Sequence, residues 1–377
     1  MNFDLSEEQK AINALSKQIF EGSSSSDRVN EVENTEDRFD TELWKELADA
    51  NLLGVGIPEK FGGLGFGIFE LSLMLEQQGR SVAPIPLLPT LIMGALPIAE
   101  FGTPEQQNRL LPKIVSGECI MTGGFQEWGA NNPMDPSLLA EFNGEHWIIN
   151  GTKPAVPVAH LADYIVLPAK TGPEETCLFL IENGTNGLEV IPSITTNREI
   201  QAQINCKSVK AEPIGETGKG YFSLVWILER INVATSAIAV GSCAKATEMA
   251  AEYTSEREQF GRPLSHNQAV TQRAADCYIG TDAMRLVLWQ AAWRLDAGYP
   301  AAEEVRIAKW WAAEIGQKVV HDVQHLHGGM GADVDYPVHR YFLWVKQLEN
   351  TLGGGSSQLA ELGALITKKA KANTFAY

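Results

Sequence analysis

The sequence is poor in cysteine and in positive charge. Its five cysteines are scattered over 377 residues, and no two have the Cys-x-x-Cys spacing of a metal or redox pair. We therefore expect free thiols in a reducing compartment and no metal site. Because 30 basic residues face 47 acidic ones, the formal net charge is -17, which repels a polyanion. No basic run with interleaved aromatic residues offsets this charge, so nucleic acid is not an expected partner.

Long apolar runs and a cationic start are also lacking. The chain begins Met-Asn-Phe-Asp-Leu-Ser-Glu-Glu-Gln, and no window has eighteen or more consecutive apolar residues. We expect no membrane span and a cytoplasmic protein. Hydrophobic residues still make up 44% of the chain, which is enough for a large core.

The periodicity of the apolar residues changes twice along the chain. It is helical in the first part, gives way to short apolar runs separated by Asn-Gly pairs, and returns to helical spacing. The short runs at 146–149, 164–167, 177–181 and 188–191 predict strands. Long helices are predicted up to Glu256 and over 268–295, 301–325 and 339–369. The pattern predicts an α+β fold with three domains: an N-terminal helical domain (1–117), a middle β domain of barrel or sandwich type (118–222) and a C-terminal four-helix bundle (223–377).

Two polar, glycine-bearing signatures interrupt the C-terminal helices. One runs from Arg257 to Pro263 and is followed by Gln268, and the other is the segment 324–331, which contains Gln324, Gly328 and Gly329. An arginine presents a fixed fork of donors to phosphate oxygens, and glycine lets backbone N–H groups come close to them. These signatures favour an anionic cofactor. The alternative is that Arg257 forms a surface ion pair and that the paired glycines only permit tight packing.

With these two signatures in this order, the chain resembles the acyl-CoA dehydrogenase family over nearly its full length. The segments 3–9, 43–47, 57–65 and 102–107 also look like parts of that family's N-terminal helical domain. The resemblance implies the acyl-CoA dehydrogenase-like fold, FAD as cofactor and an acyl-CoA thioester as substrate. It further implies α,β-desaturation as the reaction, an electron-transfer flavoprotein as electron acceptor, and a homo- or hetero-oligomer.

The resemblance also implies a role for each matched residue. Positions expected to contact an FAD bound mainly by another subunit are Arg257, Phe260 and Gln268. Positions expected along its adenosine half are Gln324, Gly328 and Gly329, and those expected near its diphosphate or ribityl region are Ser356 and Gln358.

The general base of the reaction is not where most family members have it. Gly354 stands at the position of the usual glutamate. One branch of the family has its base in a Leu-Glu-Arg sequence on the first long C-terminal helix, and this chain has Leu228-Glu229-Arg230 there. Glu229 is therefore the candidate base, with mainly apolar neighbours at helical spacing that would raise a carboxyl pKa. The alternative is that Glu229 and Arg230 form a solvated pair or a bridge between subunits.

The middle domain departs from the family where it should hold the flavin ring. In the segment 124–135 only Glu127 clearly matches, and 150–157 has neither the usual Trp nor the usual Thr. Trp128 or Phe125 could stack on the ring instead. This mixture resembles the heteromeric acyl-CoA dehydrogenases of bacterial steroid side-chain degradation, in which unlike subunits form a heterotetramer that holds fewer flavins than chains.

Two other functions remain open. The chain could be a non-catalytic subunit that completes the FAD site of a catalytic partner. It could also be a flavin-dependent oxidase or monooxygenase, since the fold alone does not determine the chemistry.

Overall fold

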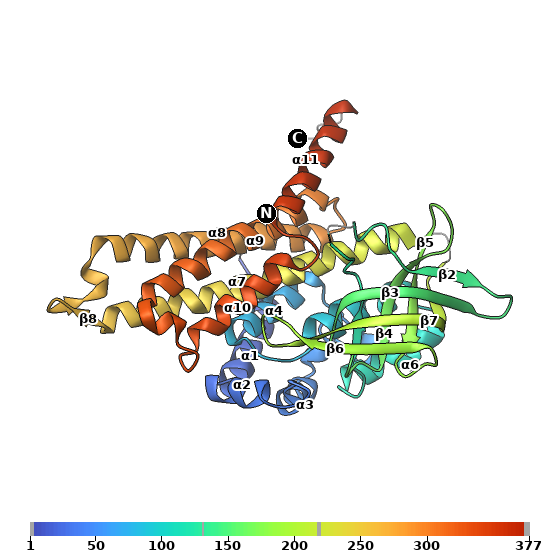
Figure 1. The fold of residues 1–377 in the computed structure, drawn as a ribbon, viewed down its shortest axis with the longest axis horizontal. Coiled ribbons are helices and arrows are strands. Elements are labelled where there is room, and N and C mark those ends of the chain that lie inside the picture. The colour runs from blue at the N-terminus through green and yellow to red at the C-terminus, as the bar shows by residue number, and fades with distance from the viewer. Residues whose placement is uncertain (1–3, 130–131, 217–219, 373–377) are drawn as a thin grey trace. The chain divides into compact units, whose positions relative to one another are not determined.

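The computed structural model describes residues 4–129, 132–216 and 220–372 of the chain (Figure 1). Phe3, which opens the motif at 3–9, and residues 130–131 of the segment 124–135 lie outside the described residues. Helices precede and follow a middle group of strands, so the predicted α+β fold is confirmed. By contacts the chain forms two compact units. Unit 1 comprises Met1–Ser26, Ser72–Ala83 and Asn232–Tyr377, and unit 2 comprises Asp27–Leu71 and Pro84–Ile231.

Unit 2 contains the short N-terminal helices and the whole sheet. Its helical segments are α2 (Ser26–Glu33), α3 (Thr41–Asp49), the π-helical η3 (Leu88–Ala95), α5 (Leu96–Phe101) and α6 (Pro104–Val115). The start of α6 follows from its sequence, because Thr103 and Gln106 form a reciprocal capping box. The Thr103 hydroxyl accepts from the Gln106 amide at 3.2 Å, and the Gln106 side chain accepts from the Thr103 amide at 3.0 Å.

The strand pairings of unit 2 close its sheet into a ring. Its strands are green to yellow-green in Figure 1. Its strands are β1 (Met121–Gly123), β2 (Leu139–Phe142), β3 (Trp147–Pro157), β4 (Tyr164–Lys170), β5 (Thr176–Glu182), β6 (Leu188–Ile194) and β7 (Ile200–Ile214). Strand pairing runs from β4 through β2, β3, β7 and β5 back to β4, with β1 beside β4 and β6 beside β7. The inward-facing apolar side chains of these strands form one core.

The four predicted strands are confirmed, but the longest strand, β7, is missed by the sequence analysis. Its residues alternate from Ile200, with Ala202, Ile204 and Cys206 buried and the residues between them more exposed. That period of two was the available signal. The pair Asn150-Gly151 was wrongly interpreted as a strand boundary. It lies inside β3, where the register shifts at a β-bulge and Gly151 adopts a φ of 127°.

Unit 1 is helical apart from one small hairpin. Its elements are α1 (Glu7–Ser23), most of α4 (Ile68–Ser81), most of α7 (Gly220–Glu256), the hairpin strands β8 (Glu258–Gln259) and β9 (Arg262–Pro263), and α8 (Gln268–Asp296), α9 (Ala302–His327), α10 (Val338–Asn350) and α11 (Gly355–Lys371). Helix α9 contacts α8, α10 and α11. The predicted helix over 339–369 is broken between α10 and α11, where Leu352 and Gly353 adopt φ values of 56° and 95°.

By length and composition α7 could span a membrane, which the sequence analysis did not anticipate. Of its most apolar window, 72% is buried inside the protein. That burial is what a core helix requires. Among the described residues no other helix meets the length and composition needed for a span.

Two glycines let α4 and α7 approach closely within unit 1. A Cβ on Gly79 would lie 2.1 Å from the carbonyl oxygen of Ile238, and one on Gly241 would lie 1.9 Å from that of Glu76. The Ser242 hydroxyl donates to the Gly79 carbonyl at 3.1 Å across the same contact. Real Cβ atoms do not approach oxygen this closely, so any side chain at either glycine would force the helices apart.

We predict that Gly241→Ala destabilises the protein by about 1–3 kcal/mol, the usual cost of overpacking. The matched control is Gly22→Ala in α1, where no atom lies within 4 Å of a new Cβ. Because alanine is the better helix former, that substitution should leave the midpoint of urea unfolding unchanged or raise it. Equal midpoints for both variants would contradict the close contact.

Candidate functional site

The first predicted FAD contacts lie on the hairpin that joins α7 to α8. Phe260 and Gly261 form its turn, with φ values of 55° and 78°, and the Phe260 side chain is 97% exposed. Arg257 and Gln268 are also exposed. Among the described residues the guanidinium of Arg257 has no hydrogen-bond or ion-pair partner. An unpaired cation beside a fully exposed aromatic ring suits an interaction with something outside this chain.

The second predicted set lies where α9 ends. The side-chain nitrogen of Gln324 donates to the Gly331 carbonyl, and its Oε1 is buried without a partner. Gly328 has a φ of 60°, and a Cβ on Gly328 or Gly329 would meet no atom within 4 Å. The two glycines therefore present open backbone at the surface, and Gln324 holds the turn while leaving one acceptor unsatisfied.

His327 lies in the same signature, and no role was predicted for it from the sequence. It is buried, stacks on Tyr253 with ring centroids 4.8 Å apart, and its Nδ1 donates to the Val323 carbonyl at 2.8 Å. Burial lowers the pKa of His327. Tyr253 lies in the last turn of α7, and Arg257 follows the end of that helix. The Arg257 amide donates to the Tyr253 carbonyl at 2.8 Å. The stacked rings thus fix the end of α9 against the end of α7, and both ends carry predicted contacts.

The third set lies in the turn between α10 and α11. Gln358 is buried, its Nε2 donates to the Leu352 carbonyl at 3.3 Å, and its Oε1 is buried without a partner. Ser356 is exposed in the first turn of α11. A Cβ on Gly355 would lie 2.1 Å from Oε1 of Glu314, so that position tolerates only glycine while the Glu314 side chain stays there.

Together these residues of unit 1 fit a ligand that carries both phosphate and hydroxyl groups. The two glutamines each have an orphaned acceptor, which calls for an O–H or N–H donor that the described residues do not supply. The open glycines and the unpaired Arg257 supply donors for an anion. FAD has both kinds of group. The donor set is therefore compatible with the cofactor expected from the sequence.

The candidate base, Glu229, lies in the third turn of α7, in the part that belongs to unit 2. It is half-buried, as are Val225 and Trp226 one turn earlier. The guanidinium of Arg230 lies 3.5 Å from the centroid of the Trp226 ring, and its Nη1 donates to the Trp226 carbonyl at 3.0 Å. Trp226 in turn packs edge-on against Phe101 at 5.1 Å. The turn before Glu229 therefore carries an aromatic contact, and the role of Glu229 as general base stays a prediction.

In the segment 124–129 the structure separates the two proposed stacking residues. Phe125 is 2% exposed and belongs to the core, whereas Trp128 is 53% exposed and is the available aromatic side chain. Glu127, which lies between these two residues in the sequence, forms a fully buried ion pair with Lys153. The Ser137 hydroxyl donates to Glu127 at 2.7 Å, and burial lowers the pKa of Lys153 against the opposing effect of Glu127. This pair fixes the segment that carries Trp128.

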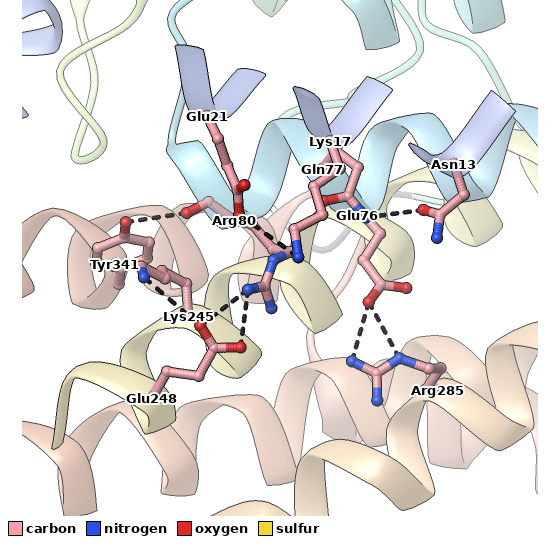
Figure 2. Close-up of polar contacts among 10 residues, drawn as sticks. All are labelled: Asn13, Lys17, Glu21, Glu76, Gln77, Arg80, Lys245, Glu248, Arg285 and Tyr341. Carbon is pink, nitrogen blue, oxygen red and sulfur yellow. Dashed lines mark hydrogen bonds and ion pairs between the residues drawn. The ribbon is translucent and has the colours of Figure 1, made fainter. Parts of the chain in front are cut away.

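The sequence analysis did not identify a cavity of about 340 Å³ in unit 1, formed by α4, α7 and α8. Figure 2 shows the polar contacts around it. Arg80 donates to both oxygens of Glu248 at 2.7 and 2.8 Å, and Arg285 donates to Glu76 at 2.9 Å. Because both guanidinium groups are already paired with carboxylates, the cavity is not an anion site. No sequence signal was available, because its charged residues come from helices far apart in the chain.

We predict that Lys153→Met alone costs about 3–5 kcal/mol of unfolding free energy, because it leaves the Glu127 carboxylate buried without a counter-charge. Adding Glu127→Gln should restore much of that loss, since the neutral pair carries no uncompensated charge. Lys170→Met is the control: its ion pair with Asp135 is exposed on the Asp135 side, so it should change stability by less than about 1 kcal/mol. Chemical denaturation of Lys153→Met, Glu127→Gln, the double variant and Lys170→Met measures these values. Additive losses in the double variant would contradict a coupled pair.

Models of known protein families match both helical parts of the chain. Residues 6–118 match the acyl-CoA dehydrogenase N-terminal domain, and residues 218–364 match the acyl-CoA dehydrogenase C-terminal domain. The acyl-CoA dehydrogenase FadE27 of Mycobacterium tuberculosis is 34% identical over 96% of this chain and 98% of its own length.

Solved structures are similar over the same length. A variant of the Tcur3481-Tcur3483 steroid ACAD has a TM-score of 0.92 and 43% identity, covering 97% of this chain and 99% of that one. The ChsE4-ChsE5 complex from Mycobacterium tuberculosis has a TM-score of 0.91 and 35% identity, with the same coverage.

The expected cofactor has a counterpart among these structures. The FAD complex of PigA has a TM-score of 0.88 and 25% identity, and covers 97% of this chain and 99% of that one. One acyl-CoA dehydrogenase domain model matches the N-terminal part of the chain and another matches the C-terminal part. A relative with 34% identity matches nearly all of the chain. The chain therefore belongs to the acyl-CoA dehydrogenase family.

Proposed function

We propose that this chain is one subunit of a heteromeric, FAD-dependent acyl-CoA dehydrogenase, and that it donates Arg257, Phe260 and Gln268 to a flavin held mainly by a related partner subunit. In this proposal Glu229 is the general base for α,β-desaturation of a bulky CoA thioester, such as one with a steroid side chain. An electron-transfer flavoprotein then accepts the electrons.

The observation that carries the proposal is the outward direction of the hairpin contacts. Arg257 has no partner among the described residues, and Phe260 exposes nearly its whole side chain. Arg257 also follows the end of an uninterrupted 37-residue helix, whereas Glu229 lies in its third turn. An unpaired cation beside an exposed aromatic ring suits contact with a ligand outside this chain.

Helix α8 supports a subunit role independently. One of its faces is buried, with Cys277, Thr281, Met284, Leu288 and Leu295 inside. On the rest of the helix four large apolar side chains are exposed by 39–68%: Tyr278, Ile279, Leu286 and Trp293. A helix that is apolar on more than one face requires a further packing partner. A chain similar to this one belongs to the ChsE4-ChsE5 complex, which supports a subunit role.

The proposed chemistry assigns one proton transfer to this chain. The Glu229 carboxylate takes the proton from the α-carbon of the acyl group, and the electron pair of that C–H bond forms the α,β double bond. FAD, when bound, accepts the hydride that leaves the β-carbon. Trp226, one turn before Glu229, packs against Phe101, and this aromatic contact holds that part of the helix.

The substrate proposal rests on open space and on the relatives. Where most family members have a glutamate, Gly354 has no side chain, and a Cβ there would meet nothing closer than 3.8 Å. A bulkier acyl group needs such space. The steroid ACAD that matches this chain at 43% identity supports a steroid-derived acyl chain.

A non-catalytic role is the second candidate, and the middle domain favours it. Phe125 is buried in the core, and the end of β3 carries two prolines, Pro154 and Pro157, which have no backbone donor. Of the aromatic residues proposed to hold the flavin ring, only Trp128 is available in this chain. In this alternative the chain completes the partner's site and Glu229 is not used.

We predict that the chain expressed alone carries far less than one FAD per chain, and that co-expression with candidate neighbouring subunits restores bound flavin. Arg257→Ala should lower the flavin retained by the complex at least tenfold at limiting FAD, because it removes a charge-assisted phosphate contact. Arg262→Ala, on the same exposed hairpin, is the control and should retain it. Flavin absorbance per chain after gel filtration measures both. A full complement of FAD in the isolated chain would contradict the need for a partner.

In the assembled complex, Glu229→Gln should leave flavin content unchanged and lower kcat by a factor of about 10²–10⁴, the usual contribution of a general base. Glu252→Gln, on the exposed side of the same helix, should have normal kcat. Bleaching of the flavin absorbance by acyl-CoA in single turnover measures the step directly. Full activity of Glu229→Gln would remove Glu229 from the reaction and support the non-catalytic alternative.

A further inference from the structure

Lys309 on α9 is completely buried, which is rare for a lysine. Its Nζ donates to the carbonyl of Leu348 at 2.5 Å and to that of Glu349 at 3.4 Å. Both carbonyls belong to the last turn of α10, where helix geometry leaves acceptors without intrahelical donors. Lys309 therefore caps α10 from a neighbouring helix.

The chain turns directly after this cap. Leu352 is buried and adopts a φ of 56°, a left-handed conformation that is uncommon outside glycine, and Gly353 follows with a φ of 95°. From the other side, Gln358 donates to the Leu352 carbonyl. The turn from Thr351 to Gly354 is thus held at both ends, by Lys309 before it and by Gln358 after it.

The charges around Lys309 do not compensate its burial. Glu349, from α10, is the charged group that acts on it, and Glu349 is itself paired with Lys346 at 2.6 Å. Burial lowers the pKa of Lys309 from its ordinary 10.5 to about 7, against the opposing effect of Glu349. The amine donates hydrogen bonds in either protonation state, so the cap persists as the charge is lost.

We infer that Lys309 is a positioning residue that fixes the turn 351–354 and, through it, Ser356 and Gln358. Its consequence for the cofactor rests on the proposed function, in which these two side chains contact FAD. The position of the turn itself does not depend on that function.

The sign of the pH dependence follows from linkage. While the turn is closed, Lys309 has the lower pKa. When the turn opens and water reaches the amine, the pKa of Lys309 returns toward 10.5. Below about pH 7 both states are protonated and the cost of burying the charge is fully present. As pH rises from about 7 toward 10.5 the closed state loses its proton first and gains stability.

Amide hydrogen exchange of the full-length chain tests the inference without FAD. In Lys309→Met, which keeps the length but removes the donor, the amides of 351–358 should exchange at least tenfold faster than in the wild type. Lys318→Met, on the exposed side of the same helix, should leave them unchanged. In the wild type, the opening constant of the turn, corrected for intrinsic exchange, should fall several-fold between pH 6.5 and 8.5. Equal protection in Lys309→Met, or a wild-type opening constant that does not change with pH, would overturn the inference.

If Lys309→Met does not fold, Lys309→Gln, which shortens the donor side chain, is measured in the same exchange experiment. A second arm measures FAD retained by the assembled complex of Lys309→Met, which should fall at least tenfold. Faster exchange with normal FAD retention would uphold the positioning role and count against Ser356 and Gln358 as FAD contacts. The two failures are therefore distinguishable.

Discussion

The burial of α7 is the constraint on which the rest of the arrangement depends. Its 37 residues are apolar enough to cross a membrane, and most of that surface is covered by the protein. In unit 1 the covering includes α4, which approaches so closely that Gly79 and Gly241 have no room for side chains. The polar side chains of α7 include Glu248, which pairs with Arg80 of α4. Glu229, in the third turn of α7, and Arg257, directly after its last residue, carry the two proposed roles on this one helix.

The buried polar groups divide into those that are satisfied within the chain and those that are left unsatisfied. Glu127 and Lys153 neutralise each other, and Lys309 is satisfied by backbone carbonyls. Gln324 and Gln358 differ, because each donates its amide to a nearby carbonyl and leaves Oε1 buried without a partner. An unsatisfied buried acceptor costs free energy that a ligand donor can recover. At Gln324 and Gln358 these orphaned atoms are compatible with the proposed FAD contacts.

The elements that could be predicted from the sequence are those whose signal is local. Helix α8 was predicted to within one residue, because it starts after a proline-containing hairpin and keeps one apolar face throughout. Strand β7 was missed although its alternation was present, because its apolar positions include small residues such as Ala202 and Cys206. The break before α11 was not predicted. The glycines between α10 and α11 were interpreted as part of the active site and not as the end of a helix. Phe125 and Trp128 are both aromatic residues of one short segment, so the sequence does not tell which of them is exposed. The packing of unit 2 buries Phe125 and leaves Trp128 exposed.

The sequence by itself determined the family and the fold class, because motif spacing and helical periodicity are local properties of the chain. Arg257 and Phe260 could be proposed as cofactor contacts from the sequence, and that role stays a prediction. Which polar side chains turn inward was decided only by the tertiary structure. Lys309 gave no sign in the sequence of being buried, and the cavity lined by Arg80 and Arg285 joins helices that are far apart in the chain. Burial and pairing depend on contacts between distant segments, and the free energy of a buried charge is set by those contacts and not by its sequence neighbours.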